Sequence, residues 1–504
     1  MPNSSDTEEF RLIVGKLQRE DQRPAALNDI KNLLELKPAN EVITAIKNVG
    51  ISEIVQCVNL SDKAQVDLTC EVLKICFNKF EPGEIIKSFT SHIMYLLRHE
   101  KSCVRKTAID EVYKSVTANA LVPAQEYLSI FVATAQMLSD SDVGVANKAI
   151  LITSNMPLEI YPTILDEMKI GLDYNSSSKC NVLEVIVNIS CKSNDHFQLC
   201  AEREYIDFMI SELKTDDVLY QLNILELLSR LVTTPQGVNY LINSGGLDAI
   251  SAKVISLKNS PLKGLLIPGY MKFFGAIAHN YPKEVFEKHA VMLDSLFEAF
   301  DTRDQAVLPV ALDTLGFIGC TIEGKLCLAA LGSKYTQTVE NVSKLVRNSK
   351  SDTKIRAMHC FADLISIDKD PAAPKTGPVD HRVTLMTREW FRTLDIKAME
   401  TLLEMCKNPF PDIRRAAFLL LDAVCQHQWG EELVARTAGF IEFLLDRSIA
   451  YTKETNEAKY EIIKRLAGSA AFDANIISSL QNYVEQGPFY SESILEVAME
   501  EGEN

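Results

Sequence analysis

One phrase of the sequence occurs twice and constrains the fold more than any other feature. Residues 351–366 read SDTKIRAMHCFADLIS, and residues 409–425 read PFPDIRRAAFLLLDAVC. Each copy sets an Asp ahead of an Ile-Arg pair and then continues with apolar residues at helical spacing. A chain that repeats such a phrase is expected to stack similar helices rather than to fold around a single core.

Weaker copies of this phrase recur toward the start of the chain at a regular interval. Their anchor residues, each followed four places later by a small or apolar residue, are Val66, Val104, Val145, Val218 and Val307. The first two intervals are 38 and 41 residues, and the next two, of 73 and 89 residues, each span about two such units. A period of about 40 residues is typical of armadillo and HEAT repeats. We therefore expect an all-α fold, an armadillo/HEAT-like α-solenoid superhelix of helical repeats with a period near 40 residues.

A second phrase repeats in step with the first. Its two matching copies, with identical spacing, are Thr234, Gly237, Leu241 and Gly245, and then Thr321, Gly324, Leu328 and Gly332. A looser third copy contains Gly430, Val434 and Gly439. The offset of 87 residues between the matching copies agrees with the 89 residues between Val218 and Val307. Two independent phrases that move together strengthen the prediction of a repeat array.

The residue types in these phrases have local roles that follow from helix chemistry. Four acidic residues stand where a helix is expected to begin and are predicted to accept hydrogen bonds from its first N–H groups: Asp142, Asp217, Asp352 and Asp412. Three glycines are predicted to relieve the turns between helices: Gly245, Gly332 and Gly439. Arg105, Arg356 and Arg414 are expected to pair with Asp residues of adjacent turns, with contact to a partner protein as the alternative.

The repeats are predicted to fill most of the chain, with one interruption. Residues 1–367 are expected to form the N-terminal and central helical repeats, and residues 382–486 the C-terminal repeats. The intervening residues 368–381 contain three prolines within eight positions, which predicts an exposed loop. Residues 487–504 carry five Glu and no Lys or Arg, which predicts an acidic tail.

Charge and composition argue against several classes of function. A net charge of -16 does not suit a protein that binds a phosphate backbone, and either a protein partner or solubility alone accounts for it. The twelve Cys residues include no CxxC pair, so we expect buried thiols rather than a metal site or disulfides. The chain shows no secretory signal, and no apolar run approaches the roughly 20 residues that a bilayer needs. We expect a cytoplasmic location, with the nucleus as a second one.

Motifs for catalysis or cofactor binding fail on inspection. Residues 319–326 nearly match a phosphate-binding loop, but Leu326 replaces the hydroxyl residue that would hold magnesium, and Glu323 would lie against the phosphates. The same glycine phrase recurs around Gly237, which explains the match without a nucleotide. The eight His residues form no metal-ligand pair, and no catalytic serine motif occurs. We therefore predict neither an enzyme nor a cofactor.

Several stretches go beyond the repeat pattern. They are IPGYMKFFGAIA from residue 267, VALDTLGFIGCTIEGKLCL from 310, LMTREWFRTL from 385, GFIEFLLDRSIAYTKETNEAKYEIIKRLA from 439 and YVEQGPFY from 483. Together they resemble the 26S proteasome non-ATPase regulatory subunit 5 family, most strongly over residues 253–490. The first half of the chain resembles the family mainly through its repeat rhythm.

The resemblance implies a dedicated chaperone for assembly of the base of the proteasome regulatory particle. Such a chaperone binds the C-terminal region of one AAA ATPase subunit, regulatory subunit 7. The complex also holds a second ATPase and the large non-ATPase scaffold subunit, and the chaperone leaves before the finished particle forms. The alternative is a general α-solenoid scaffold or adaptor of the phosphatase or cytoskeletal type, which predicts the same fold.

Partner-binding residues are predicted from repeat geometry. In this repeat type the second helix of each unit lines the concave face, and residues that flank its buried positions face the groove. These are Arg105, Asn147, Gln221, Asn223, Glu226, Asp313, Arg356 and Arg414. Tyr270 and Lys272 join them because they lie in the stretch most typical of the family. A polar groove of mixed charge suits a folded protein domain, and we expect a monomer that binds neither nucleic acid nor membrane.

Overall fold

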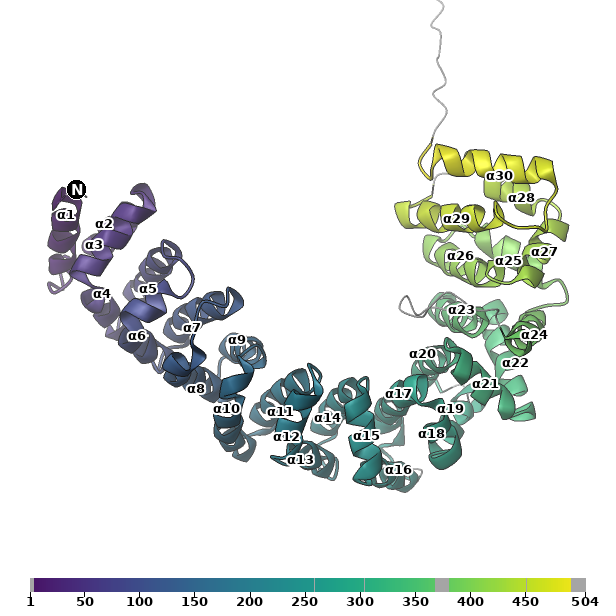
Figure 1. Ribbon diagram of the computed structural model, residues 1–504, viewed down its shortest axis with the longest axis horizontal. Helices are drawn as coiled ribbons and strands as arrows, with labels where there is room; N and C mark the ends of the chain where they lie inside the picture. Colours follow the sequence, from purple (N-terminus) through teal and green to yellow (C-terminus); the bar gives the residue numbers. More distant parts are fainter. Residues whose placement is uncertain (1–3, 258, 303, 368–379, 450, 491–504) are drawn as a thin grey trace, which may run out of the picture. The chain divides into compact units, whose positions relative to one another are not determined.

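A computed structural model describes residues 4–257, 259–302, 304–367, 380–449 and 451–490 (Figure 1). Every regular element within these ranges is a helix, and the chain builds 30 α-helices and five short 3-10 helices there, with no strand. The predicted all-α fold is confirmed. Most of the predicted proline-rich loop, residues 368–379, and most of the predicted tail, residues 491–504, lie outside the described residues.

The first of two compact units covers Met1–Asn239. Its α-helices are α1 (Ser4–Lys16), α2 (Arg23–Leu36), α3 (Ala39–Val49), α4 (Ser52–Gln56), α5 (Lys63–Asn78), α6 (Glu84–Leu97), α7 (Ser102–Thr117), α8 (Leu128–Gln136), α9 (Val143–Ser154), α10 (Tyr161–Met168), α11 (Ser176–Ser190), α12 (Asn194–Ala201), α13 (Tyr205–Glu212) and α14 (Val218–Leu231). The 3-10 helices are Cys57–Asn59, Ala124–Tyr127, Met137–Ser139, Leu158–Ile160 and Lys169–Asp173.

The second unit covers Tyr240–Asn504, and α15 (Pro235–Asn243) crosses the boundary between the units. Its further helices are α16 (Gly246–Leu257), α17 (Lys263–Asn280), α18 (Pro282–Lys288), α19 (Val291–Thr302), α20 (Leu308–Gly319), α21 (Ile322–Ala330), α22 (Ser333–Asn348), α23 (Ser351–Ile365), α24 (His381–Arg392), α25 (Ala398–Cys406), α26 (Pro411–Cys425), α27 (Gln428–Arg436), α28 (Phe440–Leu445), α29 (Lys453–Leu466) and α30 (Ala474–Gln486).

One helix of each repeat packs against its counterpart in the next repeat, and we call this series the inner row. In the first unit it consists of α2, α5, α7, α9, α11 and α14, and in the second of α17, α20, α23, α26 and α29. Within each unit the row follows the inner side of the curve in Figure 1. Each anchor of the predicted phrase lies in an inner-row helix or directly before one: Val66, Val104, Val145, Val218, Val307, Ile355 and Ile413.

Polar contacts between neighbouring inner-row helices show the same spacing. Lys148 on α9 reaches Asp110 on α7 with an Nζ–Oδ1 distance of 2.6 Å across 38 residues of sequence. Arg356 on α23 reaches Asp313 on α20 with an Nη1–Oδ2 distance of 2.8 Å across 43 residues. The predicted period near 40 residues is therefore the distance along the chain between stacked helices.

Donors from one repeat also satisfy the last carbonyl groups of the preceding inner-row helix. Lys114 donates from Nζ to the carbonyl oxygen of Phe77 on α5 at 2.8 Å. Lys192 donates in the same way to Ser154, the last residue of α9. The final carbonyls of a helix have no partner within it, and positive charge is favourable there. At these junctions one repeat completes the hydrogen bonding of the one before it.

The predicted aspartate caps form at two of the four positions. Asp142 accepts hydrogen bonds from the backbone N–H groups of Gly144 and Val145, and Asp217 accepts one from Tyr220. At the other two positions the prediction is wrong, because α23 already begins at Ser351 and α26 at Pro411. Asp352 and Asp412 lie within the first turn there, where a carboxylate still interacts favourably with the helix dipole.

The glycine phrase marks a close approach of backbone at three equivalent turns. A Cβ atom on Gly237, Gly324 or Gly430 would come within 2.3, 2.0 and 2.0 Å of the carbonyl oxygen six residues earlier. The later glycines of the phrase have the positive φ values predicted for turns: 73° at Gly245, 63° at Gly332 and 77° at Gly439. The repeated phrase is therefore required by the backbone at each of these helix–helix junctions.

Replacing Gly324 with Ala should destabilise the second unit. The new methyl group meets the backbone carbonyl of Ile318, which cannot move without disturbing the end of α20, and overpacking of this kind costs about 1–3 kcal/mol. Thermal unfolding followed by circular dichroism would measure the loss. Gly264→Ala is the matched control, because a Cβ atom added there would have no other atom within 4 Å. An equal melting temperature for Gly324→Ala and wild type would contradict the proposed contact.

A buried histidine joins two repeats of the second unit. His427 is 2% exposed, and its Nε2 donates to the carbonyl oxygen of Ile365 at the end of α23 at 2.7 Å. Burial lowers the pKa of His427 to about 4, the charge of Lys325 acts in the same direction, and the hydrogen bond to Ile365 opposes them. The imidazole is therefore neutral in the folded protein at neutral pH.

Lowering the pH should reduce the free energy of unfolding because His427 must then take up a proton. The unfolded chain binds a proton near pH 6.5, whereas the folded chain does so only near pH 4. The stability from neutral His427 is thus fully present above pH 6.5 and is lost as the pH falls toward 4, by roughly 3 kcal/mol. His427→Gln keeps an N–H donor for Ile365 but does not titrate, so its urea midpoint should fall less between pH 6.5 and 4.5. Parallel pH profiles for the two proteins would refute this assignment.

Candidate partner-binding face

All ten residues predicted to bind a partner lie on inner-row helices. In the first unit they are Arg105 on α7, Asn147 on α9, and Gln221, Asn223 and Glu226 on α14. In the second unit they are Tyr270 and Lys272 on α17, Asp313 on α20, Arg356 on α23 and Arg414 on α26. Their surroundings divide them into side chains that hold the array together and side chains that face solvent.

Two of the ten are buried, and the expectation that they face a partner is wrong. Gln221 is 2% exposed, and its Nε2 donates to the carbonyl oxygen of Leu213 at 3.1 Å. Tyr270 is 0% exposed. Both positions fall on the buried side of their helix, nearly opposite the solvent-facing residues Asn223 and Lys272, which come two positions later.

Arg105 is a structural residue. Its Nε and Nη2 donate to the two carboxylate oxygens of Asp140 at 2.6 and 2.7 Å, and its Nη1 donates to the carbonyl oxygens of His99 and Glu100. The two charged side chains are only 13% and 6% exposed. The predicted pairing with an aspartate is confirmed, and the geometry leaves this guanidinium with little surface for a partner.

Arg414 contacts an aromatic ring instead of the aspartate that was predicted. Its guanidinium carbon lies 4.9 Å from the centre of the Tyr451 ring, and Nη1 donates to the carbonyl oxygen of Asn408 at 3.2 Å. Within the described residues it makes no ion pair with an aspartate, so the predicted pairing is wrong at this position. The side chain ties α26 to the segment that precedes α29.

The solvent-facing residues of the second unit form a cluster across three successive helices. Arg356 pairs with Asp313 at 2.8 Å and, within its own helix, with Asp352 at 3.5 Å. Partial burial raises the pKa of Asp313, although the charges of Arg356, Lys272 and His359 act to lower it. His359, three residues beyond Arg356 on α23, is also exposed, and the sequence did not indicate it as a partner-binding residue. The structure thus brings Lys272, Asp313 and Arg356 together on one surface.

An exposed aromatic pair continues this surface. Phe317, one turn beyond Asp313, is 45% exposed, and its ring stacks on the imidazole of His279 with centres 4.0 Å apart and an angle of 4°. An imidazole nitrogen of His279 also lies 2.8 Å from the carbonyl oxygen of Phe317. These contacts hold an exposed ring in one orientation. We call Lys272, His279, Asp313, Phe317, Arg356 and His359 the inner-row patch.

The predicted residues of the first unit are more dispersed. Asn147, Asn223 and Glu226 are exposed. The amide nitrogen of Asn223 lies 3.9 Å from the sulfur of Cys180 on the neighbouring helix α11. These side chains are accessible, but the structure joins them into no charged cluster comparable with the inner-row patch.

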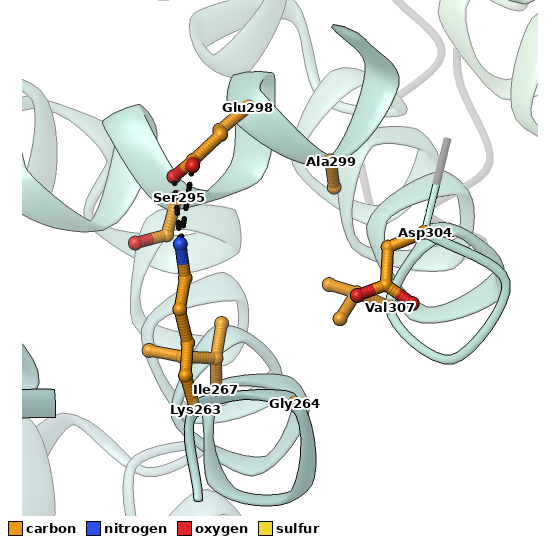
Figure 2. A pocket seen from close by; sticks show the side chains of 8 residues that line it. All are labelled: Lys263, Gly264, Ile267, Ser295, Glu298, Ala299, Asp304 and Val307. Carbon is orange, nitrogen blue, oxygen red and sulfur yellow. Dashed lines mark hydrogen bonds and ion pairs between the residues drawn. The ribbon is translucent and has the colours of Figure 1, made fainter. Parts of the chain in front are cut away.

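A small pocket of the second unit does not provide an alternative site. It is a cavity of about 160 Å³ between α17, α19 and the start of α20, lined by Lys263, Gly264, Ile267, Ser295, Glu298, Ala299, Asp304 and Val307 (Figure 2). Figure 2 shows Lys263 directed at Glu298, and its Nζ lies 3.1 and 3.2 Å from the two carboxylate oxygens. Typical ligand pockets start near 300 Å³, and the cation here is already neutralised.

The segment that resembled a phosphate-binding loop forms a helix–helix turn. Lys325, at the start of α21, is 0% exposed, and its Nζ donates to the carbonyl oxygens of Gly319 and Asp363. The amine therefore closes the turn against α23. Among the described residues, no group of three or more His, Cys, Asp and Glu could hold a metal ion, and none of the helices is long and apolar enough to cross a membrane.

The two types of arginine should respond differently to substitution. Arg105→Ala leaves Asp140 buried without its partner and should lower the free energy of unfolding by about 3–5 kcal/mol. Arg356→Ala removes an exposed pair, whose side chains are 40% and 54% exposed, and should cost less than about 1 kcal/mol. Denaturant unfolding of both variants would test this contrast. Equal losses would show that the division between structural and accessible residues is incorrect.

Several solved structures have a fold similar to that of this chain. Yeast importin-beta (Kap95p) matches with a TM-score of 0.58 and 13% identity over 95% of this chain and 65% of that one. A Kap95:Nup1 complex matches with a TM-score of 0.59 and 13% identity, over 96% and 57%. At such identity the likeness concerns the fold alone, which is an all-α solenoid.

Curated relatives cover nearly the whole chain. The 26S proteasome non-ATPase regulatory subunits 5 of Bos taurus and Homo sapiens are each 24% identical over 491 residues, which is 95% of this chain and 96% of theirs. The protein of the same name from Drosophila melanogaster is 27% identical over 445 residues, 86% of this chain and 85% of its own. A family model described as "Proteasome non-ATPase 26S subunit" matches residues 7–504. The chain therefore belongs to the family of proteasome non-ATPase 26S subunits.

Proposed function

We propose that this chain is a chaperone for assembly of the base of the 26S proteasome regulatory particle. It binds the C-terminal region of one AAA ATPase subunit, regulatory subunit 7, in a complex with a second ATPase and the large non-ATPase scaffold subunit. Membership of a proteasome subunit family supports a role with proteasome components. We place this role in the cytoplasm, and also in the nucleus.

The inner-row patch is the observation that carries the proposal. It offers three charged groups, from Lys272, Asp313 and Arg356, beside an exposed ring at Phe317. Aromatic and arginine side chains dominate the binding energy of protein interfaces, particularly when they are already held in place. The stacked His279 and the ion pair at Asp313 provide this order before a partner arrives. Such a surface suits a folded domain with its own mixed charges.

The proposed action is steric and needs no covalent step. A chaperone that covers the C-terminal region of an ATPase blocks its docking on the core particle until the neighbouring subunits are in place. Release follows when contacts between subunits compete with the inner-row patch for the same region. The contacts of two lysines support this interpretation: Lys263 is paired with Glu298, and Lys325 is buried and donates to backbone carbonyls, so neither amine is presented to a substrate.

Purification of the tagged full-length chain from cytosol tests the function directly. ATPase subunits of the base should come down with it, without subunits of the mature core particle. A wild-type pull-down that lacks ATPase subunits would refute the proposed function.

Substitution of the inner-row patch tests the site. Lys272→Glu combined with Phe317→Ala should reduce the recovered ATPase at least about tenfold, because it reverses one charge and removes an interface anchor. The matched control is Arg436→Glu combined with Leu385→Ala, on α27 and α24 outside the inner row; Arg436 is 77% exposed, and Leu385 is 49% exposed. Unchanged recovery with a well-folded patch variant would reject this surface while leaving the function intact.

A further inference from the structure

The first two helices of the chain leave an apolar groove open to solvent. The groove is a cavity of about 790 Å³ lined by Glu8, Glu9, Leu12, Ile13 and Lys16 of α1, and by Asp29, Asn32, Leu33, Leu36 and Lys37 at or next to α2. Leu12 is 65% exposed and Leu36 is 84% exposed. Large aliphatic side chains at such exposure on one groove are a feature of interaction surfaces.

The last described helix shows how this array otherwise covers a solvent-facing side. The exposed residues of α30 are all small, polar or charged: Ala474 precedes Asn475, Ser478, Ser479, Gln481, Asn482, Glu485 and Gln486. A helix with nothing packed on its outer side needs such a polar face to remain soluble. The groove of α1 and α2 does not follow this pattern, so it is suited to a covering partner.

The charges along the groove indicate which partner fits. On α1 the lining residues run from acidic Glu9 through apolar Leu12 and Ile13 to basic Lys16, with spacings that place them on one helical face. The α2 side has the same order, from Asp29 through Leu33 to Lys37. A helix with this order is complementary to a copy of itself that runs in the opposite direction, because each acidic end then meets a basic end.

We propose that α1 pairs with α1 of a second copy of this chain through a two-fold axis. An axis midway between residues 12 and 13 sets Leu12 against the partner's Ile13 and Glu9 against the partner's Lys16. A two-fold contact repeats each of these pairs, so every favourable contact occurs twice. This departs from the monomer expected from the sequence.

The groups near the contact leave these two charges available. Glu8 lies 3.8 Å from Arg11 within α1, so it already has a partner. Glu9 and Lys16 make no ion pair with any residue whose side chain the structure describes. Glu9 and Lys16 are therefore the pair on which a test of the two-fold contact should act.

Sedimentation velocity of the full-length chain over a concentration series tests the proposal. The wild type should shift from monomer to dimer as its concentration rises, and Leu12→Glu should abolish the shift. Glu9→Lys or Lys16→Glu alone should weaken the dimer about tenfold, because each replaces two ion pairs by two like-charge contacts. The double variant Glu9→Lys/Lys16→Glu should restore it, and so should a mixture of the two single variants. Leu385→Glu, at another exposed leucine, should change nothing.

Three outcomes would overturn the proposal. The first is a wild type that sediments as a monomer at every concentration, as it would if the groove binds a helix of another protein instead. The second is a dimer that Leu12→Glu leaves unchanged. The third is a double charge variant that dimerises no better than the single ones. Because the charge variants alter only exposed positions, they remain informative even if Leu12→Glu disturbs α1.

Discussion

At several junctions the array is held together by hydrogen bonds that one repeat makes to the carbonyl end of the helix before it. The last carbonyls of an inner-row helix have no partner within that helix, and Lys114, Lys192 and His427 satisfy them from the next repeat. Burial lowers the pKa of Lys192, so the contact forms even though it partly desolvates the amine. The two lysine contacts join residues 37 and 38 positions apart, about one repeat, whereas the His427 contact spans 62 positions and so forms across a longer repeat. These contacts therefore depend on how neighbouring repeats stack and not on a fixed number of residues between them.

The same requirement decides which charges remain for a partner. Where an arginine sits deep between repeats, as Arg105 does, all three of its guanidinium nitrogens donate to Asp140 or to backbone carbonyls. Nearer the solvent-facing side of the row, Arg356 keeps an exposed guanidinium while it pairs with Asp313. The inner-row patch is thus the outer part of a contact system whose inner part stabilises the fold. The proposed recognition surface and the stacking contacts thus use the same helices at different depths.

The sequence predicted which helices form the inner row better than it predicted which residues of those helices face solvent. The Asp-and-apolar phrase identified α5, α7, α9, α14, α20, α23 and α26. It missed α2 and α17, which have no side-chain cap, and α11 and α29, which begin with Asn175 and Thr452 caps. Gln221 on α14 and Tyr270 on α17 are buried, whereas Asn223 and Lys272, two positions further along the same helices, are exposed, because such a step turns a side chain to nearly the opposite side of a helix. Phe317 could not be found from the sequence, since an exposed phenylalanine and a core phenylalanine have the same local pattern. Its stacking on His279 joins residues on two different helices.

The inner-row patch and the groove of α1 and α2 differ in polarity and therefore suit different kinds of contact. The inner-row patch combines a fixed ring with charges that include the Arg356–Asp313 ion pair, which favours one partner over others more than it adds raw affinity. The groove of α1 and α2 is mainly apolar at its centre, with few charges at its ends, which suits close packing of another helix. They lie in different units and share no residue. The proposed self-association through the groove would therefore use none of the side chains of the inner-row patch.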